Sequence, residues 1–221
     1  MKKTLYSELA YILGEITLPL GAALLTKAGF GVSMVVAPAY LISEKIDFMT
    51  FGMAAYTFQA LLLAVFCLVM RKFRVKYLIS FLTAFIYGNV LDLWLWGLSF
   101  VGAETVVLRV VFMILGILFT ALGVALFFKS YIPPEVYDLF VQGISAKYGF
   151  RMGRVKWIYD LISLAVSIGL SFLFFGFLHR GIGVATIISA AVNGPLIATF
   201  TKIIDRFFDV KPGFRVPKWL A

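Results

Sequence analysis

The chain has 221 residues, of which 62% are hydrophobic and 14% are charged, and its mean hydropathy is +0.99. Soluble domains are apolar at about half of their positions, so this composition excludes an ordinary soluble protein. The net charge of +9 could suggest a nucleic-acid-binding protein. However, the basic residues lie in short segments between long apolar stretches, and we attribute them to membrane topology instead.

Six apolar stretches are candidates for membrane-spanning helices. Each has about 20 residues, enough at 1.5 Å per residue to cross a hydrocarbon core of about 30 Å. Helices are required because lipid offers the backbone no hydrogen-bonding partner. The predicted spans are Leu5–Leu25, Phe51–Met70, Tyr77–Val101, Val106–Phe128, Trp157–Phe177 and Ile182–Ile204.

Two shorter apolar stretches, Ser33–Ile46 and Pro134–Tyr148, interrupt this series. Their length suits a re-entrant or interfacial helix better than a full span. Ser33 is a suitable N-cap, and Pro134 is tolerated in a first helical turn. The free N–H groups at such helix starts could bind an anion or a substrate carboxylate, although Glu135 would oppose an anion in the second stretch.

The chain contains an internal repeat. Tyr11–Lys27 and Met113–Lys129 are identical at 8 of 17 positions, where chance in apolar sequence gives about one match in ten. Later in the two halves, Gly52 pairs with Gly153. The small-residue pairs then align, Ala84 and Gly88 with Ala190 and Gly194. Such pairs favour close helix contact.

A repeat of three spans enters the membrane from the opposite side in its second copy. We therefore predict an all-α polytopic membrane protein, a single domain over residues 1–221. It would contain two inverted three-helix repeats at about 5–101 and 106–204, each with one short helix, followed by a basic cytoplasmic tail at 205–221. Inverted repeats are typical of transporters that work by alternating access. Duplication that merely enlarged a small bundle is the alternative.

The distribution of basic residues predicts the orientation. With six spans, 16 of the 20 Lys and Arg residues lie on the side of the N-terminus, which the positive-inside rule places in the cytoplasm. Both termini and the segments 71–76 and 147–156 would then be cytoplasmic, in a bacterial cytoplasmic membrane. Glu104 and His179 would face outward.

Polar side chains inside spans are candidate functional residues, because a charged group at the membrane centre costs about 2.5–3.5 kcal/mol on insertion scales. The candidates for substrate binding or coupling within the spans are Glu15, Gln59, Asn89, Asp92, Asp160 and Asn193. Ser33, Glu135 and Asp138, at the starts of the short helices, complete the set.

Structural roles remain open for some of these. For Asp160 the structural role would be an ion pair with Lys156, one turn earlier on the same helix. For Asp92 it would be a solvated position, because this residue lies close to the outer surface. Glu15 is far from both surfaces and is either a protonatable coupling group or the partner of a buried base. Gln59 aligns with Asp160 across the repeat.

The sequence contains no arrangement typical of an enzyme or a metal site. It has no Ser-His-Asp set, phosphate-binding loop or His-Glu-x-x-His motif, and Cys67 and His179 are the only residues of their types. We expect no catalytic activity, no cofactor and no metal.

Several motifs resemble a known family. Lys27-Ala28-Gly29-Phe30-Gly31-Val32-Ser33, the segment 153–160 and the glycine-rich segment 181–195 are similar to those of the YczE/YyaS/YitT-like bacterial integral membrane proteins. Relatives tend to continue after Ser33 with a Pro-Trp-Asp-like sequence, whereas this chain reads Met34-Val35-Val36. The resemblance implies a membrane location and fold, and little chemistry.

Two functions fit these observations. The first is a transporter of an unknown small solute or ion, with its site between the two halves. The second is a membrane regulator or partner subunit that transports nothing and docks a cytoplasmic protein through its basic loops. In both cases the lipid bilayer is the surrounding partner, no nucleic acid is involved, and a homo-oligomer is possible.

Overall fold

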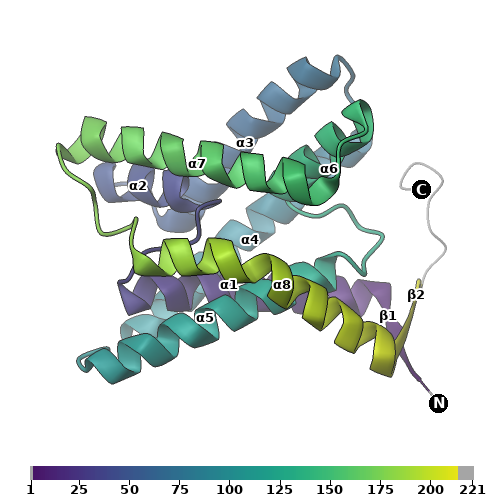
Figure 1. The fold of residues 1–221 in the computed structure, drawn as a ribbon, viewed down its shortest axis with the longest axis horizontal. Helices are drawn as coiled ribbons and strands as arrows, with labels where there is room; N and C mark the ends of the chain where they lie inside the picture. Colours follow the sequence, from purple (N-terminus) through teal and green to yellow (C-terminus); the bar gives the residue numbers. More distant parts are fainter. Residues whose placement is uncertain (1, 214–221) are drawn as a thin grey trace.

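The computed structural model describes residues 2–213. In this range the chain forms eight helices and two short strands (Figure 1), in the order β1 (Lys3–Tyr6), α1 (Ser7–Ala28), α2 (Ala37–Lys45), α3 (Phe51–Met70), α4 (Val75–Ser99), α5 (Val106–Phe127), α6 (Val136–Tyr148), α7 (Met152–Phe175), α8 (Val184–Phe207) and β2 (Phe208–Lys211). Six of the helices, all except α2 and α6, are long and apolar enough to cross a membrane. The prediction of a helical protein with six candidate membrane spans is therefore confirmed.

The two strands are absent from the sequence-based prediction, which begins the first span at Leu5. Instead, β1 pairs in parallel with β2, and α1 begins at Ser7. Pairing supplies hydrogen-bond partners for backbone groups that lie beyond the ends of α1 and α8. The predicted basic tail at 205–221 thus begins as the end of α8 and a strand, and its residues 214–221 lie outside the described part of the chain.

The two short helices begin later than predicted. Ser33 is not the N-cap of α2 but lies in the turn that precedes it, where its carbonyl accepts hydrogen bonds from the N–H groups of Val36 and Ala37. Val36 is the N-cap instead, without a side-chain hydrogen bond. In the second half, Glu135 is the N-cap of α6. The fifth span begins earlier than predicted, at Met152, because the Arg151 carbonyl accepts from the N–H groups at the start of that helix.

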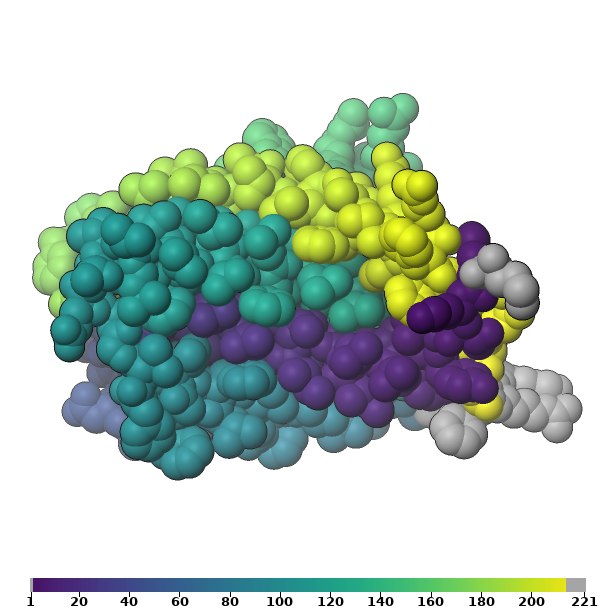
Figure 2. All heavy atoms as spheres, turned by 90° about the horizontal axis from the view of Figure 1, so that it is seen from below, coloured from purple at the N-terminus to yellow at the C-terminus, as the bar shows by residue number. Residues whose placement is uncertain are grey.

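The helices form two layers. One contains α1, α4, α5 and α8, and the other contains α2, α3, α6 and α7 (Figure 1). Both short helices pack between α3 and α7. On the face shown in Figure 2, α1 lies between α4 and α5, and β1 meets β2 at one end. The N-terminal turns of α2 and α6 are therefore buried inside the bundle and do not lie on its surface.

Closely packed glycines join α1 to α5, the most extensive helix contact in the protein. A Cβ added to Gly14 would lie 3.3 Å from the carbonyl oxygen of Gly123, and one added to Gly21 would lie 2.7 Å from the carbonyl oxygen of Gly116. The earlier glycine of α1 contacts the later glycine of α5, and the later one contacts the earlier, so the two helices are antiparallel. Small residues at these positions let the two backbones approach closely.

Candidate functional site

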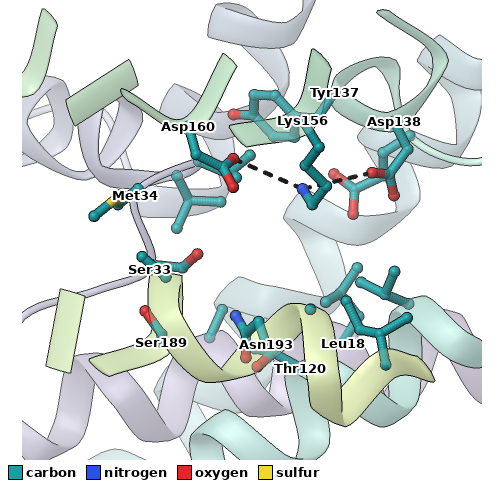
Figure 3. A pocket seen from close by; sticks show the side chains of 18 of the residues that line it. Leu18, Ser33, Met34, Thr120, Tyr137, Asp138, Lys156, Asp160, Ser189 and Asn193 are labelled. Carbon is teal, nitrogen blue, oxygen red and sulfur yellow. Dashed lines mark ion pairs between the residues drawn. The ribbon is translucent and has the colours of Figure 1, made fainter. Parts of the chain in front are cut away.

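A cavity of about 230 Å³ lies between the two layers, on the side where α7 faces α8 (Figure 3). One wall is formed by α1, α5 and α8, and the other by α7 and the segments that begin α2 and α6. Its polar lining consists of Ser33, Tyr87, Thr120, Glu135, Tyr137, Asp138, Lys156, Trp157, Asp160, Ser189 and Asn193. The rest of the lining is mainly apolar.

Two helix starts meet at this cavity. Ser33 and Val36 line it immediately before α2, and Glu135 and Asp138 line it at the beginning of α6. The N-terminus of a helix carries a partial positive charge and unpaired N–H groups. Glu135 and Asp138 place carboxylates at the start of α6, which favours that helix.

Lys156 lies between two carboxylates of the cavity wall (Figure 3). Its Nζ is 3.9 Å from Oδ1 of Asp138 and 3.7 Å from Oδ1 of Asp160. Both distances exceed the usual range of a hydrogen bond from nitrogen to oxygen. The ammonium group therefore balances charge without being firmly bound to either carboxylate.

Several polar atoms at the cavity have no hydrogen-bond partner. They are the hydroxyl of Tyr137 and Oδ1 of Asn193, and Oδ1 of Asp160 has only the ammonium group of Lys156, at 3.7 Å. Buried polar groups are almost always paired, and leaving one unpaired costs about 1–3 kcal/mol. Two unpaired atoms and one loosely paired carboxylate around one cavity indicate a place where another molecule can supply the missing partners.

Behind the cavity, Gln59 and Glu135 form a buried polar pair. The Gln59 side chain is fully buried, and its Nε2 donates to Oε2 of Glu135 at 2.6 Å, while its Oε1 accepts from the N–H of Val136 at 3.0 Å. The carboxamide thus fixes the carboxylate and satisfies an N–H group at the start of α6.

Glu15 lies close to this pair. It is 4% exposed, its carboxylate oxygens make no hydrogen bond of normal geometry, and it interacts with the hydroxyl of Tyr11 one turn earlier on α1 and electrostatically with Glu135. Two buried carboxylates with like charge repel each other unless a proton or a cation is shared between them. Glu15 does not line the cavity itself, but Leu18, one turn further along α1, does.

The structure brings most of the predicted site residues to one region. Ser33, Glu135, Asp138, Asp160 and Asn193 line the cavity, and Gln59 and Glu15 lie behind it. Asn89 is exposed and donates to the carbonyl of Phe85 on its own helix. Asp92 accepts hydrogen bonds from the Thr50 hydroxyl and the N–H of Gly52, and so holds the start of α3.

Two features of the cavity differ from the sequence-based prediction. The small residues Ala190 and Gly194, predicted at a helix contact, line the cavity instead. Tyr137 was not among the predicted site residues, and no pattern in the sequence separates it from the other tyrosines. Lys156 was predicted only as a partner of Asp160, since its link to Asp138 depends on how α6 and α7 pack.

The far end of the cavity is closed by backbone hydrogen bonds between the two halves of the chain. The N–H of Val32 donates to the carbonyl of Gly181, and the N–H of Ala185 donates to the carbonyl of Phe30. Gly31, at φ +104°, leaves no room for a Cβ beside Gly183. These contacts join the segment after α1 to the segment before α8.

Among residues 2–213, no group of three or more His, Cys, Asp or Glu side chains is placed to hold a metal ion. The cavity instead combines carboxylates, one ammonium group, hydroxyls and apolar surface. This mixture is typical of a site that binds a small molecule by a few polar contacts.

Comparison with known proteins places the chain in a family. Residues 5–202 match the model of a family of unknown function, DUF6198. The chain belongs to this family. It is also 27% identical over 207 residues to the uncharacterized protein YyaS of Bacillus subtilis (strain 168), an alignment that covers 90% of this chain and 94% of that protein. No solved structure matches the chain.

The family assignment confirms the resemblance inferred from the glycine-rich motifs. The matched residues include all six long helices up to Lys202 and every residue that lines the cavity. The cavity therefore belongs to the part of the chain that defines the family.

Proposed function

We propose that this protein transports a small solute or ion across the bacterial cytoplasmic membrane by alternating access between two inverted repeats. The observation that carries the proposal is a difference between two glycine pairs that correspond in the repeat. Gly52 and Gly88 are in contact, whereas their counterparts Gly153 and Gly194 are separated and border the cavity.

In the first half, α3 and α4 are closed against each other. A Cβ added to Gly52 would collide with the carbonyl oxygen of Gly88, and one added to Gly88 would lie 2.6 Å from the carbonyl oxygen of Gly52. The two backbones are thus in direct contact, which only glycine at both positions permits.

In the second half, the corresponding helices α7 and α8 are apart. A Cβ added to Gly153 or to Gly194 would have nothing within 4 Å, and both residues line the cavity. Glycine is unfavourable inside a helix by about 1 kcal/mol relative to alanine. A second conformation in which Gly153 packs against Gly194 would give both residues a structural purpose.

The contacts of α1 with α5 support an inverted relation between the halves. The repeat pairs Gly14 with Gly116 and Gly21 with Gly123. In the structure Gly14 lies against Gly123 and Gly21 lies against Gly116, so each contact is the counterpart of the other. A two-fold axis between antiparallel helices produces this reciprocity. The positions of α2 and α6 between α3 and α7 are consistent with the same axis.

Exchange of the two arrangements would complete a transport cycle. In the described state, α7 and α8 are apart and the bonds from Val32 to Gly181 and from Ala185 to Phe30 close the opposite end. In the exchanged state, α7 and α8 would close, and α3 and α4 would separate. Such exchange between similar halves is how inverted-repeat transporters expose one site to each side of the membrane in turn.

The buried acids suggest how transport is coupled. Glu15 interacts electrostatically with Glu135, and Glu135 also borders the cavity. We assign to this pair the binding of a coupling proton or ion, released when the cavity changes sides.

Cross-linking of introduced cysteines tests the alternation without knowledge of the solute. In a Cys67→Ala background, Gly153→Cys combined with Gly194→Cys should form a disulfide in native membranes, because closure would bring the two Cα atoms within about 7 Å. Gly169→Cys with Gly194→Cys is a matched control. Gly169 lies on the same helix and also has nothing within 4 Å of an added Cβ, but it is four turns away.

Flux in proteoliposomes provides the second measurement. A solute that stabilises the purified protein should be transported by the reduced double-cysteine protein and not by the oxidised one. Absence of a 153–194 cross-link, or solute flux that is unchanged by it, would contradict alternating access. Recovery of a cytoplasmic protein cross-linked through residues 151–156, with no flux, would favour the non-transporting regulator.

A further inference from the structure

We propose that the cavity binds a small organic cation, with an ammonium or guanidinium head and a short apolar tail. This inference rests on the proposed function in treating the cavity as the site of the transported solute. Its binding test, however, does not require transport.

The charges around the cavity favour a cation. Glu135, Asp138 and Asp160 contribute three carboxylates, and Lys156 is the single basic side chain among the described residues that line it. A cation entering the cavity would therefore be attracted, and an anion repelled, by the summed field of these groups.

The position of Lys156 indicates that the site accommodates an ammonium group. Its ammonium group stands between Asp138 and Asp160 at 3.9 and 3.7 Å, without a hydrogen bond to either. A charged hydrogen bond from nitrogen to a carboxylate is normally 2.7–2.9 Å long. A free ammonium ion, unrestrained by a helix backbone, could approach both carboxylates more closely and displace the lysine side chain.

Polar atoms of the cavity wall that lack a hydrogen bond also favour a ligand with N–H donors. Tyr137 is 5% exposed and its hydroxyl has no partner. In Figure 3 the hydroxyl lies on the Asp160 side of the cavity. Oδ1 of Asn193 likewise has no partner, and Oδ1 of Asp160 has only the ammonium group of Lys156, beyond hydrogen-bond distance. The Asp160 and Asn193 oxygens can only accept hydrogen bonds and the Tyr137 hydroxyl can accept one, so a ligand that carries several N–H groups can serve all three.

The remaining lining sets the size and character of the tail. Leu18, Ala22, Val124 and Ile197 cover the wall away from the carboxylates, and Trp157 supplies an aromatic side chain. Apolar and aromatic surface suits a short hydrocarbon chain, and an aromatic face also attracts a cation. A cavity of about 230 Å³ is small for a drug-sized ligand and fits a molecule of a few carbon atoms.

Three probes of equal chain length test the charge of the ligand. The thermal midpoint of the purified full-length protein in detergent would be measured with butylammonium, butyrate and 4-aminobutyrate at equal ionic strength, with sodium chloride as reference. We expect butylammonium to raise the midpoint with saturation, and the other two probes and sodium chloride to leave it unchanged. A rise with butyrate, with 4-aminobutyrate or with sodium chloride alone would overturn the proposal.

Charge variants test the location. Asp160→Asn and Asp138→Asn should each weaken butylammonium binding by about thirtyfold or more, whereas Asp205→Asn, an exposed carboxylate paired with Lys129, should not. Lys156→Met should tighten binding, because it removes the competing ammonium group. Weaker binding in Lys156→Met would mean that the lysine recognises an anionic group and would overturn the proposal, even where an aspartate variant fails to fold. Binding without flux would leave the cation site intact and refute only the proposed transport.

Discussion

Gly52 and Gly88 lie in backbone contact where α3 crosses α4, and no side chain larger than hydrogen fits between them. The same two positions in the second half, Gly153 and Gly194, border an open cavity. One sequence pattern thus occurs in both a closed and an open arrangement within a single chain. Substitution of these glycines by larger residues should therefore have different effects in the two halves.

Alanine at these positions should separate stability from activity. Gly52→Ala should lower the thermal midpoint, because the added methyl group meets the backbone of Gly88 and overpacking of this kind costs about 1–3 kcal/mol. Gly153→Ala should leave the midpoint equal or higher, since it has free space and improves helix propensity, yet it should reduce solute flux by obstructing closure. Equal midpoints for the two variants would contradict the closed contact at Gly52, and unreduced flux in Gly153→Ala would contradict closure of α7 on α8.

Gln59 should be essential for stability. Gln59→Leu removes both the donor to Glu135 and the acceptor for the N–H of Val136, and each buried group left unpaired costs about 1–3 kcal/mol. The thermal midpoint should fall clearly. Asn89→Leu is the matched control, because Asn89 is exposed and bonds only to its own helix. A midpoint for Gln59→Leu as high as that of the control would show that water or rearrangement replaces the lost bonds.

The sequence predicts the long helices well because apolar length is a local property. Phe51–Met70, for example, has the predicted boundaries. Local patterns also identified Glu135, Asp160 and Asn193 as polar groups among apolar neighbours. They could not show that Asp138 shares Lys156 with Asp160, since those residues come from two helices whose packing is not encoded in either one alone.

The strands and the role of Asp92 had no readable local signal. β1 has only four residues and pairs with a segment over 200 positions away, so its partner determines its conformation more than its own sequence does. Asp92 lies in an apolar span like the other candidates, yet it serves as a hydrogen-bond acceptor for the first turn of α3. To distinguish such a helix-capping acid from a ligand-binding one, it is necessary to know which helix packs against it.

Acid should loosen the loop that closes one end of the cavity. Burial lowers the pKa of His179 below its ordinary value of 6.5; Glu44 opposes this shift and Arg180 adds to it. The neutral ring accepts a hydrogen bond from the N–H of Gly181 at Nδ1, and the carbonyl of Gly181 in turn accepts from Val32. Because the folded state binds the proton more weakly than the unfolded state, stability is full above pH 6.5 and falls as the pH drops below it.

The thermal midpoint between pH 8 and pH 5 measures this effect. It should be flat above about 6.5 and decline below it. His179→Gln should show a smaller decline, since glutamine cannot take up the proton. An identical decline in wild type and His179→Gln would assign the pH dependence to other groups.

Labelling of single cysteines should establish the orientation. The connection between α3 and α4, the connection between α6 and α7, and β1 and β2 lie at one end of the molecule (Figure 1), and these segments carry many of the basic residues. The positive-inside rule places that end in the cytoplasm. In intact cells lacking Cys67, an impermeant thiol reagent should label Glu104→Cys and not Arg74→Cys. Labelling of Arg74→Cys alone would reverse the orientation.

Glu15 should matter for activity more than for folding. Its carboxylate is buried beside the hydroxyl of Tyr11, without a hydrogen bond of normal geometry, whereas its counterpart in the repeat, Ile117, is buried against Leu25 and Ala185. Neither packing nor duplication requires an acid at this position, and its electrostatic interaction with Glu135 connects it to the cavity. We therefore expect Glu15→Gln to keep a thermal midpoint close to that of the wild type while it abolishes flux driven by a proton gradient.

Ile117→Ala is the control, and it should lower the thermal midpoint but keep the gradient-driven flux. A cavity in the core costs about 2–5 kcal/mol, whereas the acid pair stays intact. Flux normalised to folded protein in proteoliposomes, with and without an imposed pH gradient, separates the two effects. Gradient-driven flux retained in Glu15→Gln would remove Glu15 from the coupling mechanism, and loss of that flux in folded Ile117→Ala would show that packing at this level of the bundle, not charge, controls transport.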